Sequence, residues 1–226
     1  GTILNNIISN NSADYGGGFW MCDGTIQNNV IKDNSANYSG GGLEFCGGVI
    51  QNNIISGNSA PLGGGLDSCY NTILNNTIFG NYADNIGGGL YWCDGVILNC
   101  IIWQNTAPSS PQIDDSSSTP SYSCIQDWSG GGTGNISDDP LLVNPAVGDF
   151  HLQAGSPCID AGGNVTGLTQ DFEGDPRPFD GTPEPRGDGS DFDIGADEFV
   201  IKTTLAVFSE YDNPVPPVGI NFLTSG

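Results

Sequence analysis

The sequence predicts an all-β fold, a right-handed parallel β-helix, from a repeat that runs through its first hundred residues. Each copy spans roughly 23–24 residues, a period typical of solenoids, and contains an Asn-rich stretch, an Asn-x-Ala, a Gly-Gly-Gly and a Cys. The first glycine of each triplet keeps one fixed separation from the alanine of the next copy, as from Gly16 to Ala36 and from Gly40 to Ala60. A repeat of fixed core length with one variable turn is typical of a solenoid whose coils stack on one another.

The apolar residues of the repeat predict short strands. Isoleucine occupies the same two positions in every copy, and short β-branched runs broken by Asn and Gly indicate strands rather than helices. A coil of this length has room for three short strands, with successive coils about 4.8 Å apart. A left-handed helix would use shorter, hexapeptide-based coils, so we expect the right-handed form. The stacked columns are Ile3, Ile26, Ile50, Ile73 and Ile97; Ile8, Ile31, Ile55, Ile78 and Ile102; and Phe19, Leu43, Leu66 and Leu90.

Two columns of asparagine predict ladders inside the coil. Stacked amides can bond along the axis and satisfy the backbone of the turns, so we assign both ladders a structural role. One ladder is Asn11, Asn34, Asn58, Asn81 and Asn105; the other is Asn6, Asn29, Asn53 and Asn76, until Cys100 interrupts it.

Four of the seven cysteines form a further ladder, with one in each of the first four copies of the repeat. Adjacent coils bring their Cα atoms within the window of roughly 4.4–6.8 Å that a disulfide needs, but in-register side chains point the same way. Buried free thiols, disulfides and a metal site are the three interpretations. Zinc is disfavoured because there is no Cys-x-x-Cys and His151 is the single histidine. The ladder is Cys22, Cys46, Cys69 and Cys93.

Composition indicates an acidic extracellular protein. The 226 residues include 35 Gly, and 26 Asp+Glu against 4 Lys+Arg give a net charge of −22. This charge excludes nucleic acid and anionic membranes as partners, and no apolar run is long enough for a membrane span. We divide the chain into a parallel β-helix over 1–162, an Asp/Pro-rich closing segment over 163–200, and, over 201–226, a linker with the start of a further β module or an exchanged tail.

Motifs after residue 139 resemble a known class of proteins. Asp-Pro-Leu-Leu, Gly-Asp-Phe-His-Leu, Ser-Pro-Cys-Ile-Asp-Ala-Gly, an Asp-x-x-Gly-x-x-Arg-Pro that begins at Asp171, and Asp-Ile-Gly-Ala-Asp-Glu follow in this order. They resemble the C-terminal end of the "choice-of-anchor Q" class of secreted bacterial right-handed β-helix proteins, and the glycine-triplet repeats resemble those of bacterial surface adhesins. The resemblance implies a β-helix at the bacterial cell surface and no catalytic residues.

One face of the repeat carries the candidate contact residues. The residue after the inward Phe/Leu column turns outward by strand alternation. The column after it is also rich in large apolar groups, so some rings must be exposed. Exposed aromatics beside carboxylates suit the stacking of a sugar or contact with a protein. The candidates for this glycan- or protein-contact face are Trp20, Glu44, Asp67, Tyr91 and Trp92.

We expect a non-enzymatic structural or adhesive module of a large bacterial surface protein, whose partners are copies of itself, other surface proteins or glycans. The alternative is a polysaccharide lyase or glycoside hydrolase on the same fold. A lyase needs a base near its substrate, and the regular repeats hold only Lys32. A hydrolase needs clustered carboxylates, for which Glu44 and Asp67 are the one pair on successive coils. We assign no catalytic residue.

The Asp-rich closing segment predicts Ca²⁺ as a cofactor. Carboxylates at this density repel one another, and their hard oxygen atoms suit Ca²⁺. The alternative is that the Asp side chains cap turns and bond local backbone. We also expect Arg177 to be buried against one or more of these acids. The candidate metal ligands are Asp171, Asp175, Asp188, Asp191 and Asp193.

The two ends of the chain raise the question of assembly. Residues 1–11 would present an open β-edge, and strand-like runs within 203–226 lie outside the regular coil. A tail that covers the next copy would build a filament. The competing interpretation is a piece of a longer protein, with further coils before Gly1 and a further domain after the tail.

Overall fold

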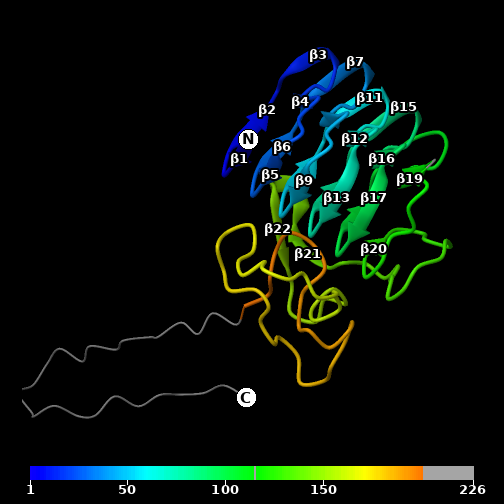
Figure 1. Cartoon of the computed structure of the whole chain (residues 1–226). Helices are drawn as coiled ribbons and strands as arrows, with labels where there is room; N and C mark the ends of the chain where they lie inside the picture. Colours follow the sequence, from blue (N-terminus) through cyan, green and yellow to red (C-terminus); the bar gives the residue numbers. More distant parts are fainter. Residues whose placement is uncertain (115, 201–226) are drawn as a thin grey trace, which may run out of the picture.

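The computed structural model describes residues 1–114 and 116–200, and its coils form a parallel β-solenoid (Figure 1). Each of the first four coils carries four strands, not the expected three. The three predicted apolar columns lie in sheets A, B and D, and the additional strand is that of sheet C, whose buried residue is only an alanine, such as Ala60 or Ala83. Sheet A contains β1 (Thr2–Leu4), β5 (Thr25–Gln27), β9 (Val49–Gln51), β13 (Tyr70–Leu74) and β17 (Asp94–Leu98). Sheet B contains β2 (Ile7–Ser9), β6 (Val30–Lys32), β10 (Ile54–Ser56), β14 (Thr77–Phe79), β18 (Ile101–Trp103) and β20 (Cys124–Ile125). Sheet C contains β3 (Ser12–Tyr15), β7 (Ser35–Ser39), β11 (Ser59–Leu62) and β15 (Tyr82–Ile86), and sheet D contains β4 (Phe19–Trp20), β8 (Leu43–Glu44), β12 (Leu66–Asp67), β16 (Leu90–Tyr91) and β19 (Ile113–Asp114).

The predicted columns stack in register and form the core. Ile26 pairs with Ile50 in sheet A, Ile31 with Ile55 in sheet B, and Leu43 with Leu66 in sheet D. These side chains are essentially inaccessible to water and belong to one continuous apolar cluster along the axis. In-register pairing keeps every inward residue inward, since a slip by one residue would turn the whole set outward.

A left-handed residue turns the chain between strands. Asn28 and Asp33 have φ of 55° and end the strands of sheets A and B in the second coil, and Phe45, with φ of 51°, ends the strand of sheet D. Asn and Asp tolerate this conformation through local hydrogen bonds, whereas a phenylalanine is strained there. The residue after each of these turns faces the interior and supplies the Asn and Cys ladders.

The asparagine ladders are formed as predicted. Asn58 Oδ1 accepts hydrogen bonds from the backbone N and the Nδ2 of Asn34, both at 3.0 Å, and Asn58 Nδ2 donates to Ile31 O at 2.9 Å. Cys100 continues the second ladder. Its thiol contacts Ile73 O at 3.5 Å and Leu98 O at 3.4 Å. Asn76 Nδ2 donates to the equivalent carbonyls one coil earlier, those of Ile50 and Leu74. All seven cysteines are free in this structure, and Cys22 is the one that is not fully buried.

Residues 142–200, which include the predicted Asp/Pro-rich stretch over 163–200 and which we call the closing segment from here on, cover the coil from the side. This segment begins with an antiparallel pair, β21 (Leu142–Asn144) and β22 (Asp149–Leu152), separated by a 3-10 turn, η1 (Pro145–Val147). Figure 1 shows the later part, in yellow and orange, beside the coil. Apolar residues on the outer side of sheet B, such as Ile54 and Ile101, pack against this segment in a second core. The last parallel strand is β20, and the predicted boundary at residue 162 stays a prediction.

A column of asparagines at the corner of sheets A and B holds this segment. Asn52 Nδ2 donates to Gln170 O at 2.8 Å, Asn75 Nδ2 donates to another carbonyl of the segment at 3.3 Å, and Asn99 exchanges two bonds with Gly163, at 2.7 and 2.8 Å. These are the same left-handed turn residues that end the strands of sheet A. Three successive coils are therefore fastened to one irregular segment.

The expected tail interactions fall on residues 203–226, which lie outside the described residues. Within 1–114 and 116–200, no helix has the length and apolar character of a membrane span.

Candidate functional site

The two-residue strands of sheet D place one outward column across the coils. Trp20 pairs with Glu44, Glu44 with Asp67, and Asp67 with Tyr91. The column continues to Asp114, the partner of Tyr91, which sequence reasoning missed because Ser110-Pro111-Gln112 replaces the glycine triplet there. Asp114 could have been found from the pair Ile113-Asp114, which matches Leu43-Glu44 and Leu66-Asp67 of the earlier coils.

Glu44 and Asp67 face away from the apolar core, yet the expectation that they are exposed is wrong. They are only 2% and 4% accessible. The glycine bend between sheets C and D lies against them, so closely that a Cβ at Gly40 would stand 2.4 Å from Glu44 Cβ, and one at Gly63 would stand 2.7 Å from Asp67 Cβ. Sequence alternation gives the direction of a side chain, but not the neighbouring sheet that covers it.

Each of these carboxylates has one satisfied and one unsatisfied oxygen. Ser39 Oγ donates to Glu44 Oε1 at 2.7 Å, and Ser68 Oγ to Asp67 Oδ1 at 2.6 Å. Glu44 Oε2 and Asp67 Oδ2 are buried without a hydrogen-bond partner. Burial raises the pKa of both groups, and the charge of Asp67 adds to the shift of Glu44. We call Glu44 and Asp67 the carboxylate pair; it can bind a proton, or accept a hydrogen bond from a hydroxyl group that reaches it.

Exposed aromatic side chains surround the carboxylate pair. Trp20 is 53% and Trp92 55% accessible, while Tyr91 is half-buried and its ring stacks on Trp92 with centroids 5.8 Å apart. Tyr15 stacks on Trp20 at 6.3 Å and on Tyr38 at 5.0 Å. The exposed aromatics of the described residues lie in sheet C, in sheet D, in the turn after sheet D or, for Tyr70, at the start of β13 in sheet A. We call this set the aromatic face: Tyr15, Trp20, Tyr38, Phe45, Tyr70, Tyr82 and Trp92.

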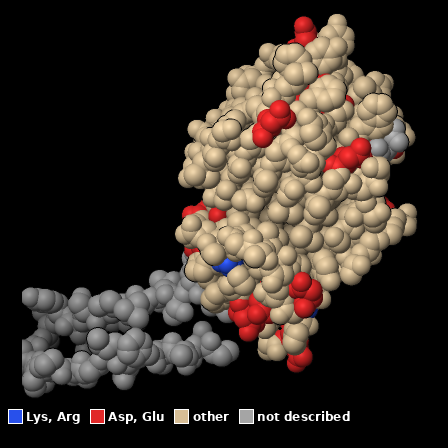
Figure 2. Space-filling view, viewed as in Figure 1, with Lys and Arg blue, Asp and Glu red and all other residues tan. Residues whose placement is uncertain are grey.

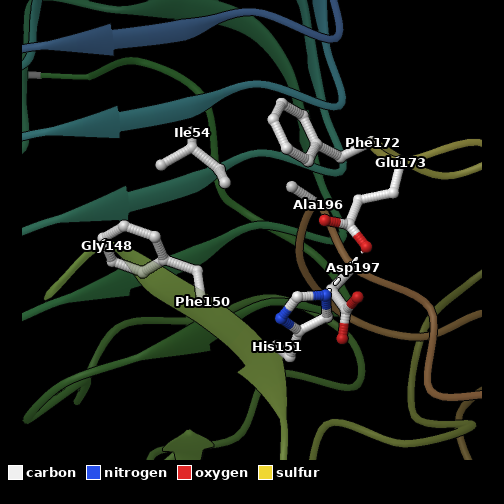
Figure 3. A pocket seen from close by; sticks show the side chains of 8 residues that line it. All are labelled: Ile54, Gly148, Phe150, His151, Phe172, Glu173, Ala196 and Asp197. Atoms are coloured by element: carbon white, nitrogen blue, oxygen red, sulfur yellow. Dashed lines mark hydrogen bonds and ion pairs between the residues drawn. The ribbon is translucent and has the colours of Figure 1, made fainter. Parts of the chain in front are cut away.

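A small cavity lies between sheet B and the closing segment (Figure 3). Its volume is about 50 Å³, enough for one or two water molecules. His151, on β22, bridges two acids at its mouth: Nδ1 lies 2.6 Å from Asp149 Oδ1 and Nε2 lies 2.8 Å from Glu173 Oε2. The arrangement ties β22 to the loop at Glu173 and leaves no room for a larger ligand.

His151 predicts a pH dependence of stability. Burial alone would lower the pKa of His151, but its bonds to Glu173 and Asp149 and the charges around it raise this pKa to about 9, from an ordinary 6.5. A raised histidine pKa stabilises the folded state fully below about pH 6.5, and the gain is lost as the pH rises toward 9. In thermal melts across this window we expect the Tm of His151→Gln to fall less steeply than that of the parent. Parallel curves for the two proteins would contradict the assignment.

The five predicted calcium ligands do not come together. Asp171 Oδ1 accepts from the backbone N of Glu173, Gly174 and Asp175, each at 2.8 Å. Asp193 and Asp188 likewise accept backbone N–H groups at 2.6–3.0 Å. The alternative interpretation, that Asp side chains bond local backbone, holds for Asp171 and in part for Asp188 and Asp193, which also accept from the distant backbone N of Asn164 and Asp160.

Asp191 instead joins two acids that the sequence did not single out. One carboxylate oxygen from each of Asp160, Asp180 and Asp191 lies within 4.8 Å of the others. This cluster could hold a metal ion. Asp160 was missed because its motif, Ser-Pro-Cys-Ile-Asp, stands well before the Asp-rich stretch.

Arg177 is buried, as predicted, at 3% accessibility. Its Nε lies 2.6 Å from Glu198 Oε2, and its other nitrogens donate to Asn52 Oδ1 at 3.1 Å and to Asp197 O at 2.6 Å. This guanidinium therefore joins the closing segment to the third coil.

Comparisons with protein-family models, with curated proteins and with solved structures gave no match. The repeat register and the stacked parallel sheets define the chain as a β-helix repeat protein.

Proposed function

We propose that this chain is an extracellular structural and adhesive module of a bacterial surface protein, and that it binds a neutral glycan chain along the aromatic face. The gathering of all exposed aromatics of the described residues on this one face supports the proposal. Sugar rings stack on such side chains. The net charge of −22 disfavours an acidic polymer.

The geometry of the face fits an extended ligand. Trp20 and Tyr91 stand three coils apart on one column, which corresponds to about 14 Å along the axis. A chain laid along the axis would meet the exposed rings of Trp20 and Phe45 at the first two coils and of Trp92 at the fourth. The closing motifs, by their resemblance, support a location at the bacterial surface.

A second candidate, glycoside hydrolysis, is favoured by the carboxylate pair alone. Two carboxyl groups on adjacent strands, both with a raised pKa, resemble the acid and base that such hydrolysis requires. A lyase would need a basic side chain beside the carboxylate pair. The Lys and Arg side chains of the described residues lie elsewhere: Lys32 on sheet B, and Arg177 and Arg186 in the closing segment.

Binding assays with soluble neutral polysaccharides (β-glucan, mannan and starch) test both candidates. We expect the double variant Trp20→Ala, Trp92→Ala to bind roughly 5- to 150-fold more weakly than the parent, because each of the two stacked rings contributes about 0.5–1.5 kcal/mol. Val147→Ala is the control, since Val147 is exposed but lies on η1, outside the aromatic face. Equal affinity in the double variant, or no binding by the parent, would contradict the proposal. If the parent protein releases reducing ends from these polysaccharides and the Glu44→Gln variant does not, hydrolysis is the function instead.

Ca²⁺ is the cofactor that we propose for a module in this location. Hard carboxylate oxygens are its preferred ligands, and Figure 2 shows acidic side chains gathered at the end of the molecule formed by the closing segment.

A further inference from the structure

Three carboxylates from separate turns of the closing segment converge on one point. Asp160 follows Ile159, which is anchored in the second core, while Asp180 follows Phe179 and Asp191 precedes the buried Phe192. One oxygen of each lies within 4.8 Å of the other two. Asp160 is buried, Asp191 half-buried and Asp180 exposed, so the cluster opens to solvent on one side.

A second observation, independent of this convergence, is an unsatisfied oxygen. Asp160 is 1% accessible, and its Oδ1 accepts from Gly181 N at 3.0 Å. Its Oδ2 is buried without a hydrogen-bond partner. A buried carboxylate oxygen that is left unpaired is costly, and a bound cation would remove that cost.

No basic side chain of the described residues neutralises the three acids. Arg177 is the nearest in sequence, three residues before Asp180, but its Nε pairs with Glu198 Oε2 at 2.6 Å. Arg186 is the next nearest, and its Nη1 donates to the carbonyls of Ser156 and Ile159, at 3.3 and 3.4 Å. No ion pair within 4.0 Å joins Arg186 to any of the three.

We infer that Asp160, Asp180 and Asp191 bind one Ca²⁺ ion, which fastens the loop 180–191 to the part of the closing segment that is packed on the coil. Ca²⁺ takes six to eight oxygen ligands at flexible geometry, so water completes the shell on the open side. The inference rests on the proposed function only for the choice of Ca²⁺ as the ion, and the site is separate from the aromatic face.

Calorimetric titration of the full chain with CaCl₂ tests the inference. We expect one ion per chain and a Tm that rises by roughly 5–10 °C at a hundredfold excess over the dissociation constant. Asp180→Asn should weaken Ca²⁺ binding at least tenfold. The exposure of Asp180 keeps this variant folded, unlike a change at the buried Asp160. Glu184→Gln is the matched control, since Glu184 is exposed on the same loop and lies outside the cluster.

Two outcomes would overturn the inference: a parent protein that neither binds Ca²⁺ nor gains stability at millimolar CaCl₂, or an Asp180→Asn variant that binds as tightly as Glu184→Gln. Glycan binding is measured separately, so loss of the proposed function with an intact Ca²⁺ site, or the reverse, can be distinguished.

Discussion

Replacement of Arg177 by alanine should lower the free energy of unfolding by about 3–5 kcal/mol, the usual cost of removing one partner from a buried ion pair. Glu198 is as inaccessible as Arg177 and would keep its charge without a counter-ion. Asn52 Oδ1 and the carbonyl of Asp197 would lose their donor as well. Denaturant unfolding at pH 7 measures the effect.

The pH dependence of this loss separates the ion pair from simple packing. Burial raises the pKa of Glu198, while Arg177 holds it down, so removal of the guanidinium raises that pKa further. A protonated Glu198 needs no counter-charge, and the deficit of Arg177→Ala should therefore shrink as the pH falls toward 5. Glu198→Gln in the same chain should restore part of the stability.

Arg186→Ala is the control, because Arg186 is exposed and makes only two long bonds to carbonyls. We expect a change within about 0.5 kcal/mol for this surface position. Similar losses for the two arginine variants would show that Arg177 does not hold the closing segment to the coil.

The coil could be predicted from the sequence because each feature repeats four or five times at a spacing of 23–24 residues. A single isoleucine such as Ile31 could belong to a helix or to a strand. Five isoleucines at the same position of the repeat are all buried in one arrangement, a stack of parallel strands. The strands of sheet C escaped prediction for the opposite reason: the buried residue of each is an alanine, such as Ala60, which gives no β-branched signal, and its pairing appears only when the coils are stacked.

The site was less predictable because it depends on contacts between distant segments. The column that contains Glu44 could be read from strand alternation, whereas its burial depends on a glycine bend of a different sheet. The metal cluster likewise combines Asp160 with Asp191, which lie far apart in an irregular segment with no repeat to align them. In the coil the repeat spacing predicts which residues meet, whereas the closing segment has no repeat from which such contacts could be predicted.

The asparagine ladder should be the other large determinant of stability. Asn58→Ala removes a side chain that is fully buried in the middle of its column. The change leaves Ile31 O without the donor at 2.9 Å and Asn34 N without the acceptor at 3.0 Å. Each buried polar group that loses its partner costs about 1–3 kcal/mol, so we expect a loss of about 2–6 kcal/mol in denaturant unfolding.

Two controls locate the cause of this loss. Asn37→Ala, on the neighbouring strand β7, removes only an exposed bond to Asp14 and should change stability by less than about 0.5 kcal/mol. Asn58→Asp keeps the acceptor for Asn34 but cannot donate to Ile31 O, and it adds a buried charge, so it should be at least as unstable as the alanine variant. An aspartate variant that folds as well as the parent would show that the donated bond is dispensable. In that case the apolar columns alone would hold the coils in register.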